Sequence, residues 1–233
     1  MTGKTIAIVQ SNYIPWKGYF DMIHMADEFV LLDDIQYTRR DWRNRNKIKT
    51  PNGLHWLTIP VVVKGKYFQR IDETQISDRS WSEQHWTTLE QFYRRAPCFS
   101  LYCDDVRTWY DRAGKYERLS EVNHWFLSRI CETLRIPTKI RWSTEFSTPD
   151  EKSERLLAIC LQAGASRYLS GPAAKGYLDV NAFRDQGIDV LWMDYGGYRP
   201  YPQLFGDYEH GVSVLDMLFN VGAAATQYLK SFT

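Results

Sequence analysis

Two adjacent carboxylates, Asp33 and Asp34, directly follow the apolar stretch 29–32 and precede a strongly basic segment. Residues 37–49 include six Lys or Arg and one Asp, a local charge of +5 in a chain whose formal net charge is +1. Arginine binds phosphate and carboxylate through paired hydrogen bonds, and a carboxylate accepts protons or holds sugar hydroxyls. We therefore expect Asp33 and Asp34 to be the acid–base or ribose-contacting candidates, both ionised near neutrality because nearby Arg favours the charged form. Consecutive residues of an extended chain point to opposite faces, so we expect one of them to face the cleft and the other to cap or pack.

The basic segment also contains Asn and Trp, whereas a purely solvated face favours flexible Lys. A single loop of this charge in a nearly neutral chain favours a small phosphorylated ligand over a polynucleotide and gives no reason to expect DNA. RNA binding by Arg and aromatic stacking, or a plain surface loop, are the alternatives. The predicted substrate and phosphate contacts here are Gln36, Arg39, Arg40, Arg43, Arg45 and Asn46.

A second candidate segment, 10–19 (QSNYIPWKGY), connects a predicted strand to a predicted helix. The free N–H groups and the positive dipole end of a helix N-terminus favour an anion. We expect Asn12 to act in catalysis, near donors for a developing oxyanion. An ordinary strand-to-helix turn with Pro15 near the first helical position is an equally good interpretation. The expected binding residues are Gln10, Tyr13, Trp16 and Gly18.

A third segment follows the predicted strand 167–169. Ser170 and Gly171 are small enough to let backbone approach a ligand, and Lys175 lies four positions beyond the glycine, within reach of a phosphate. The spacing of a phosphate-binding P-loop is absent, so an ordinary turn is the alternative. The aromatic and Pro/Gly-rich stretch 195–205 is interpreted equally well as a lid or as a packed surface loop.

Metal and nucleophile signatures are missing. The four cysteines show no CxxC spacing, the five histidines are scattered, and no GxSxG motif occurs, so we expect no metal site and buried, reduced thiols. The sequence shows no cationic leader and no apolar run of the ~20 residues that span a bilayer. These features predict a cytoplasmic protein without membrane insertion.

Hydrophobic periodicity predicts alternating strands and helices at both ends of the chain and helices in its middle. The opening strand 5–10, helix 16–26 and strand 29–32 form a βαβ unit, which is parallel and right-handed. The remaining expected strands are 56–63, 139–142, 167–169 and 189–193, and the remaining helices are 82–95, 101–110, 119–134, 150–163, 180–186 and 212–221.

This alternation predicts a single α/β domain over residues 1–233, with a parallel, doubly wound, Rossmann-like sheet of five or six strands and a helical insertion at 80–135. Ligands of open parallel sheets bind beyond the carboxyl ends of the strands. The candidate segments all follow predicted strands. We therefore expect Asp33, Arg43, Arg45 and Asn46 to converge on one cleft with the turn 11–18.

The stretch 7–61, with YIPWKGYF at 13–20 and WRNRN at 42–46, resembles the WbqC-like family. The resemblance continues through 82–99, 170–178, 201–203 and 213–222 and so covers essentially the whole chain. It implies an association with bacterial O-antigen (lipopolysaccharide) and other surface polysaccharide biosynthesis. It also implies a role in adding glycine or a similar acyl group to an amino sugar.

A weaker likeness at the level of the fold links the chain to the nucleotidyltransferase and pantothenate-synthetase class, which binds ATP at the turn after the first strand. This likeness implies ATP as a possible cofactor. The chain departs from that class in lacking its paired His motif and has Asn12, Pro15 and Gly18 in the turn instead.

The leading hypothesis is an N-acyltransferase or amide-forming ligase that acts on a nucleotide-linked amino sugar. The acyl donor is an adenylate made in place, an acyl carrier protein or an aminoacyl-tRNA, and the sequence leaves these donors and the oligomeric state open. The alternative is a non-catalytic protein of the same pathway that binds a nucleotide sugar or another phosphate ligand. The absence of a recognised nucleophile, metal site and phosphate loop favours this alternative modestly.

Overall fold

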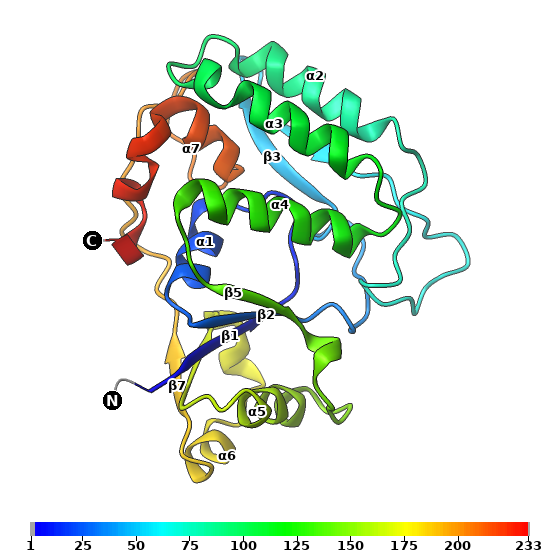
Figure 1. Cartoon of the computed structure of the whole chain (residues 1–233), viewed down its shortest axis with the longest axis vertical. Helices are drawn as coiled ribbons and strands as arrows, with labels where there is room; N and C mark the ends of the chain where they lie inside the picture. The colour runs from blue at the N-terminus through cyan, green and yellow to red at the C-terminus, as the bar shows by residue number, and fades with distance from the viewer. Residues whose placement is uncertain (1–2, 233) are drawn as a thin grey trace.

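The computed structural model describes residues 3–232 and centres on a five-stranded sheet in the order β5-β2-β1-β6-β7 (Figure 1). All four strand pairs are parallel. Strands β1 and β2 end together, since Val9 pairs with Leu31. The sheet is formed by β1 (Thr5–Val9), β2 (Glu28–Leu31), β5 (Lys139–Trp142), β6 (Arg167–Ser170) and β7 (Asp189–Trp192).

Helices cover both faces of this sheet. In Figure 1, α1 (Lys17–His24) and α4 (Leu119–Leu134) lie on one side, and α5 (Lys152–Gln162) and α6 (Val180–Asp185) lie on the other. Successive strand residues point to opposite faces. Accordingly, Ala7 belongs to the hydrophobic cluster with α1 and α4, whereas Ile6 and Ile8 belong to the cluster with α5 and α6. This mostly parallel, two-sided arrangement is compatible with a Rossmann-like fold.

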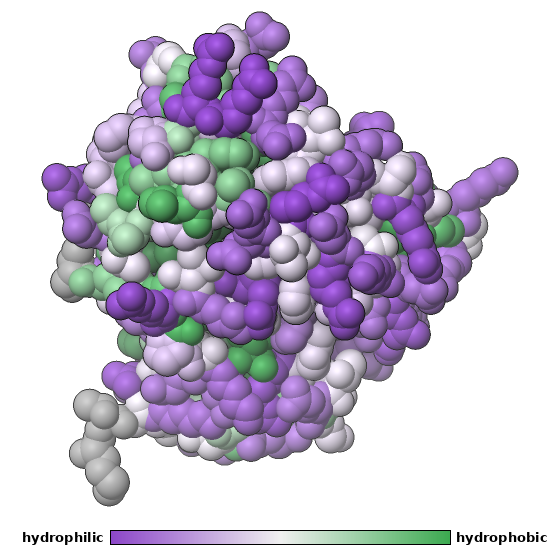
Figure 2. All heavy atoms as spheres, turned by 45° about the horizontal axis from the view of Figure 1, so that its top comes forward, coloured by the Kyte–Doolittle hydropathy of each residue, from purple (hydrophilic) through white to green (hydrophobic). Residues whose placement is uncertain are grey.

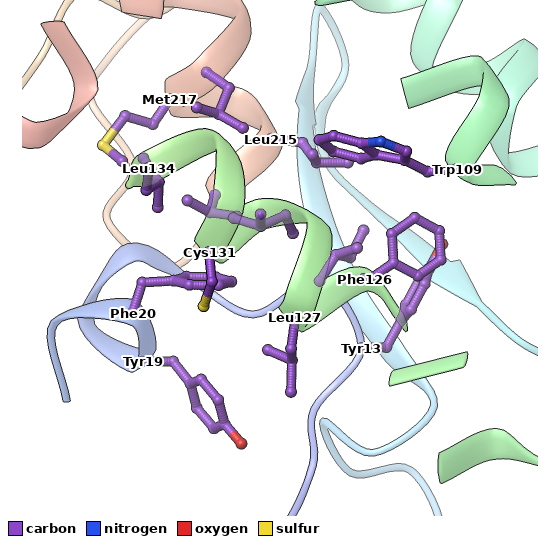
Figure 3. Packing of buried hydrophobic residues seen from close by; sticks show 14 of the residues in the cluster. Tyr13, Tyr19, Phe20, Trp109, Phe126, Leu127, Cys131, Leu134, Leu215 and Met217 are labelled. Atoms are coloured by element: carbon purple, nitrogen blue, oxygen red, sulfur yellow. The ribbon is translucent and has the colours of Figure 1, made fainter. Parts of the chain in front are cut away.

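Three long helices fill the middle of the chain, as the periodicity predicts: α2 (Trp81–Tyr93), α3 (Phe99–Ala113) and α4. They share one hydrophobic cluster with α1 and with α7 (Val214–Val221). Figure 3 shows Phe126, Leu127 and Cys131 of α4 inside this cluster, which also holds Tyr13. Short 3-10 helices follow at Ser143–Glu145, Pro172–Gly176, Gly222–Tyr228 and Lys230–Phe232.

The prediction that strand 56–63 follows the first βαβ unit is wrong in its bounds and its partner. Residues Arg45–Thr50 (β3) and Gly53–Thr58 (β4) form a separate antiparallel hairpin. Two residues join them, and so short a connection permits only antiparallel pairing. Gly53 has φ +97°, which a side chain disfavours. The second half of the basic segment is therefore a strand rather than a loop.

The face in Figure 2 is largely hydrophilic, and its apolar area gathers at the upper left. Within residues 3–232, no helix has the length and apolar character that crossing a membrane requires. All four cysteines are free. Cys131 and Cys160 are buried as expected, but Cys98 and Cys103 are half-exposed.

Candidate functional site

The carboxyl ends of β1 and β2 are joined by direct hydrogen bonds. The pairing extends one residue beyond β2, because the Leu32 N–H donates to the carbonyl of Val9, the last residue of β1, at 3.0 Å. The Ser11 N–H then donates to Asp33 Oδ1 at 2.8 Å. The turn after β1 is thus attached to the acidic corner after β2, as expected for neighbouring parallel strands.

The basic segment docks onto the same turn. The Asn46 side chain donates to the carbonyl oxygens of Tyr13 and Ile14 at 3.1 and 2.9 Å, and the Tyr13 N–H donates to the Trp42 carbonyl. Ile14 has φ +35°, a strained value for a β-branched residue, and such strain persists only where the surroundings enforce it. Asn46 is therefore a buried clamp on the turn.

A cavity of about 570 Å³, called here the first cavity, opens at this edge of the sheet. Three of its lining side chains are cationic and three are acidic, so it offers both charges to a ligand. It is lined by Gln10, Leu32, Asp34, Ile35, Gln36, Thr38, Asp41, Arg43, Ile71, Asp150, Lys152, Arg155, Leu156 and Tyr177.

Asp33 and Asp34 have different surroundings, since consecutive residues of an extended chain face opposite ways. Asp34 lines the first cavity, accepts a hydrogen bond from Ser143 Oγ at 2.6 Å and lies 3.6 Å from Arg155 Nη1. Asp33 is 1% exposed and does not line the cavity. Asp33 therefore positions the Ser11 turn, and only Asp34 is available to a ligand.

At Asp33 burial outweighs the effect of the nearby Arg43 on the pKa, although a carboxyl with a pKa of about 6 is still mostly ionised at pH 7. Burial raises the pKa of Asp33 to about 6, although the hydrogen bonds from Ser11 and the charge of Arg43 act in the opposite direction. Asp33 Oδ2 has no hydrogen-bond partner among the described residues, so the buried charge is only partly compensated.

Of the predicted basic contacts, Arg43 reaches the first cavity. Its Nη1 donates to Gln10 Oε1 at 3.3 Å, and its Nη2 lies 3.8 Å from Asp41. Arg39 donates instead to the Val63 carbonyl, and Arg45 donates to the Arg40 carbonyl and lies over the Trp56 ring. The structure therefore brings Gln36 and Arg43 into the first cavity and leaves Arg39, Arg40 and Arg45 outside its lining.

The residues of the turn after β1 have different roles. Tyr13 is fully buried, and its hydroxyl bonds with His85 Nδ1 at 2.9 Å and with the Tyr110 hydroxyl at 2.7 Å, so it is a core residue. At Gly18 a Cβ atom would lie 2.4 Å from the Trp16 ring, so this glycine allows the ring to pack. Asn12 and Trp16 line a different, second cavity.

The segment after β6 lies at the same edge of the sheet but outside the first cavity. Ser170 is buried, Gly171 precedes a 3-10 helix, and the exposed Lys175 lies 5.4 Å over the Trp192 ring. Only Tyr177 of this region lines the first cavity. The stretch 195–205 packs on α1, where Tyr195 contacts Trp16.

Lys152 and Arg155 are cavity residues that the sequence analysis missed. They lie in the first turn of α5, the helix that follows β5. Strand β5 pairs with β2, so the connection after β5 passes beside Asp34. The sequence does show two cations at the start of a helix that follows a strand. This pattern indicates a contact near Asp34 only when the strand order is known.

No group of three or more His, Cys, Asp or Glu side chains in residues 3–232 is arranged to hold a metal ion. The open parallel sheet defines an α/β protein, and the mixed-charge cavity at its carboxyl edge is the candidate ligand site.

Comparison with known proteins assigns the chain to a family. The model of the WbqC-like protein family matches residues 10–228, and the chain belongs to this family. The chain is also similar to the uncharacterized protein Rv1507c of Mycobacterium tuberculosis, with 49% identity over 227 residues that cover 97% of this chain and 98% of the relative. No solved structure matches.

Proposed function

We propose that this protein transfers an acyl or aminoacyl group, of the glycine type, to the amine of a nucleotide-linked amino sugar. The observation that carries the proposal is the first cavity, in which Arg43, Lys152 and Arg155 surround a space that also contains Asp34. The setting in surface polysaccharide biosynthesis follows from the resemblance to the WbqC-like family.

The cavity suits a nucleotide-linked ligand in size and charge. Its volume of about 570 Å³ is within the range of small-molecule sites. The guanidinium groups of Arg43 and Arg155 would hold phosphate oxygens through paired hydrogen bonds, with the Lys152 ammonium as a further charge. The apolar side chains of Leu32 and Leu156 would face the rings of the ligand.

Asp34 would deprotonate the amine of the bound sugar. The amine nitrogen then forms a bond to the acyl carbonyl carbon, the bond from that carbon to the donor's leaving group breaks, and the amine proton goes to Asp34. Gln10 accepts from Arg43 through Oε1, so its NH₂ group is left to stabilise the developing oxyanion. This assignment replaces Asn12, which lines the other cavity.

A second candidate function is binding without catalysis. It is favoured by one observation, the double engagement of Asp34, whose Oδ1 accepts from Ser143 while Oδ2 faces Arg155. A carboxylate with both oxygens engaged has to give up one of these contacts before it can accept a proton from the amine. In this case the cavity would retain a nucleotide-linked sugar for another protein of the pathway.

The test is to incubate the full chain with a panel of nucleotide-linked amino sugars and each donor class, then to follow the sugar by mass spectrometry. The donors are glycine with ATP, a charged acyl carrier protein and an aminoacyl-tRNA, and the ATP arm also tests the nucleotidyltransferase-like interpretation. We expect a mass increase with one donor, lost in Asp34→Asn and retained in the exposed control Asp105→Asn. Tight binding without a mass increase from any donor would support the second candidate.

A further inference from the structure

The second cavity lies on the other side of the turn after β1. Its volume is about 280 Å³, and it shares no lining residue with the first cavity. Residues from three separate segments form its walls: the turn itself, the basic segment including β3, and the loop before α7. The lining residues are Asn12, Pro15, Trp16, Trp42, Asn46, His210 and Gly211.

The chemistry of this lining differs from that of the first cavity. It contains no carboxylate, Lys or Arg, and its walls are formed by two indole rings and a proline. Burial, with a smaller effect of the Lys17 charge, lowers the pKa of His210. Its imidazole is therefore neutral at pH 7 and offers one donor and one acceptor. The lining thus suits an uncharged ligand that has both an apolar face and polar edges.

The cavity is rigid on two sides. The Trp16 ring packs on Tyr195 and Tyr198 with centroid distances of 5.4 Å, and the Asn46 amide is fully engaged with the Tyr13 and Ile14 carbonyls and the Lys47 N–H. These contacts fix the walls before any ligand arrives, which lowers the entropic cost of binding.

The Asn12 side chain has a buried acceptor without a partner among the described residues. Its Oδ1 is buried and has no hydrogen bond to any residue in 3–232. A buried acceptor without a partner destabilises the protein, so a ligand that donates a hydrogen bond here would remove this cost. The strained Ile14 backbone follows two residues later, as is common at functional sites.

We propose that the second cavity is a binding site for one uncharged saccharide ring. Such a ring has an apolar C–H face, which packs on an indole, and hydroxyl or amide groups at its edge, which bond with Asn12 and His210. The site is independent of the proposed function, because the two cavities have separate linings. It would hold a second sugar unit, apart from the phosphate-bearing ligand of the first cavity.

The experiment uses the full chain and methyl N-acetyl-β-D-glucosaminide as an uncharged sugar probe, with uridine as an uncharged nucleoside control. Binding is followed by saturation-transfer NMR and by the indole N–H signals of the protein. We expect the glycoside to bind and to shift the Trp42 signal. Asn12→Ala and Trp42→Ala should each weaken binding about tenfold or more, the change that about 1.4 kcal/mol produces.

Two variants outside the second cavity serve as controls. Trp56→Ala removes the neighbouring exposed indole, 5.4 Å from Trp42 but outside the lining, and Arg155→Ala alters only the first cavity. Both should bind the glycoside as the wild type does. Any of three outcomes would overturn the proposal. The glycoside does not bind at about 10 mM, its affinity falls as much in Trp56→Ala as in Trp42→Ala, or uridine binds this site more tightly than the glycoside. Failure of the transfer assay with glycoside binding intact would overturn only the proposed function.

Discussion

The buried carboxylate of Asp33 should make the stability of this protein depend on pH in a direction opposite to that of most surface carboxylates. Its pKa is about 6 in the folded protein against an ordinary value of 3.8. The folded state therefore binds the Asp33 proton more tightly than the unfolded state does. This contribution to stability is fully present below about pH 4 and is lost as the pH rises through 6.

The magnitude follows from the shift of about two pKa units. Each unit corresponds to about 1.4 kcal/mol, so ionisation of Asp33 removes about 3 kcal/mol of unfolding free energy between pH 4 and pH 7. The substitution Asp33→Asn abolishes this titration. The new amide also places an unpaired N–H group in the protein, but that cost does not depend on pH. The difference in unfolding free energy, variant minus wild type, should thus rise by about 3 kcal/mol between pH 4 and pH 7.

The assay is urea denaturation of the wild type and the variant at several pH values in this range, with the exposed Asp105→Asn as a matched control. The control should give a small difference that changes little with pH, because water solvates the exposed Asp105 side chain in the folded and the unfolded state. A difference for Asp33→Asn that is constant with pH, or that falls as the pH rises, would refute the assignment of Asp33 as a buried, poorly compensated carboxylate.

Three further predictions concern the turn and the first cavity. Asn46→Ala should lower the unfolding free energy by about 3 kcal/mol, because two carbonyls and one N–H lose their partner. If urea denaturation showed no larger effect than for the exposed control Asn52→Ala, Asn46 would not be a clamp on the turn. Gly18→Ala should destabilise the protein by about 1–3 kcal/mol through the clash with Trp16, whereas Gly176→Ala, where a Cβ meets nothing within 4 Å, should be close to neutral in the same measurement. Arg155→Ala should weaken the binding of uridine monophosphate about tenfold or more and reduce the salt dependence of this binding. Arg45→Ala should leave the affinity and its salt dependence unchanged. If calorimetry at two salt concentrations showed the larger effect for Arg45→Ala, the first cavity would not be the phosphate site.

The sequence alone predicted the elements whose signals are local. The apolar runs of β1 and β2 and the helical spacing of 82–134 depend on residues a few positions apart, so they were identified without the tertiary structure. The adjacency of the first turn to the Asp33–Asp34 corner also followed, because consecutive strands of a βαβ unit are parallel and their carboxyl ends meet.

The hairpin β3–β4 shows where local reasoning failed. The polar sequence of β3, RNKIKT, predicts a loop, yet Ile48 is buried on one side of the strand and Leu57 of β4 packs in the same hydrophobic cluster. Ile48 is the only apolar residue of this strand, and the other buried residues, Asn46, Lys49 and Thr50, are polar or charged, so the periodic hydrophobic signal is weak. Its pairing with β4 supplies the missing stabilisation.

The composition of the candidate site was decided by the tertiary structure. Lys152 and Arg155 share the first cavity with Asp34 because β5 is the neighbour of β2. The buried Tyr13 hydroxyl finds its partners in His85 and Tyr110, 72 and 97 residues away. The order of strands and the partners of a buried hydroxyl depend on the packing of the whole chain. Local sequence therefore determined which residues end the strands, and long-range packing determined which of them share a cavity.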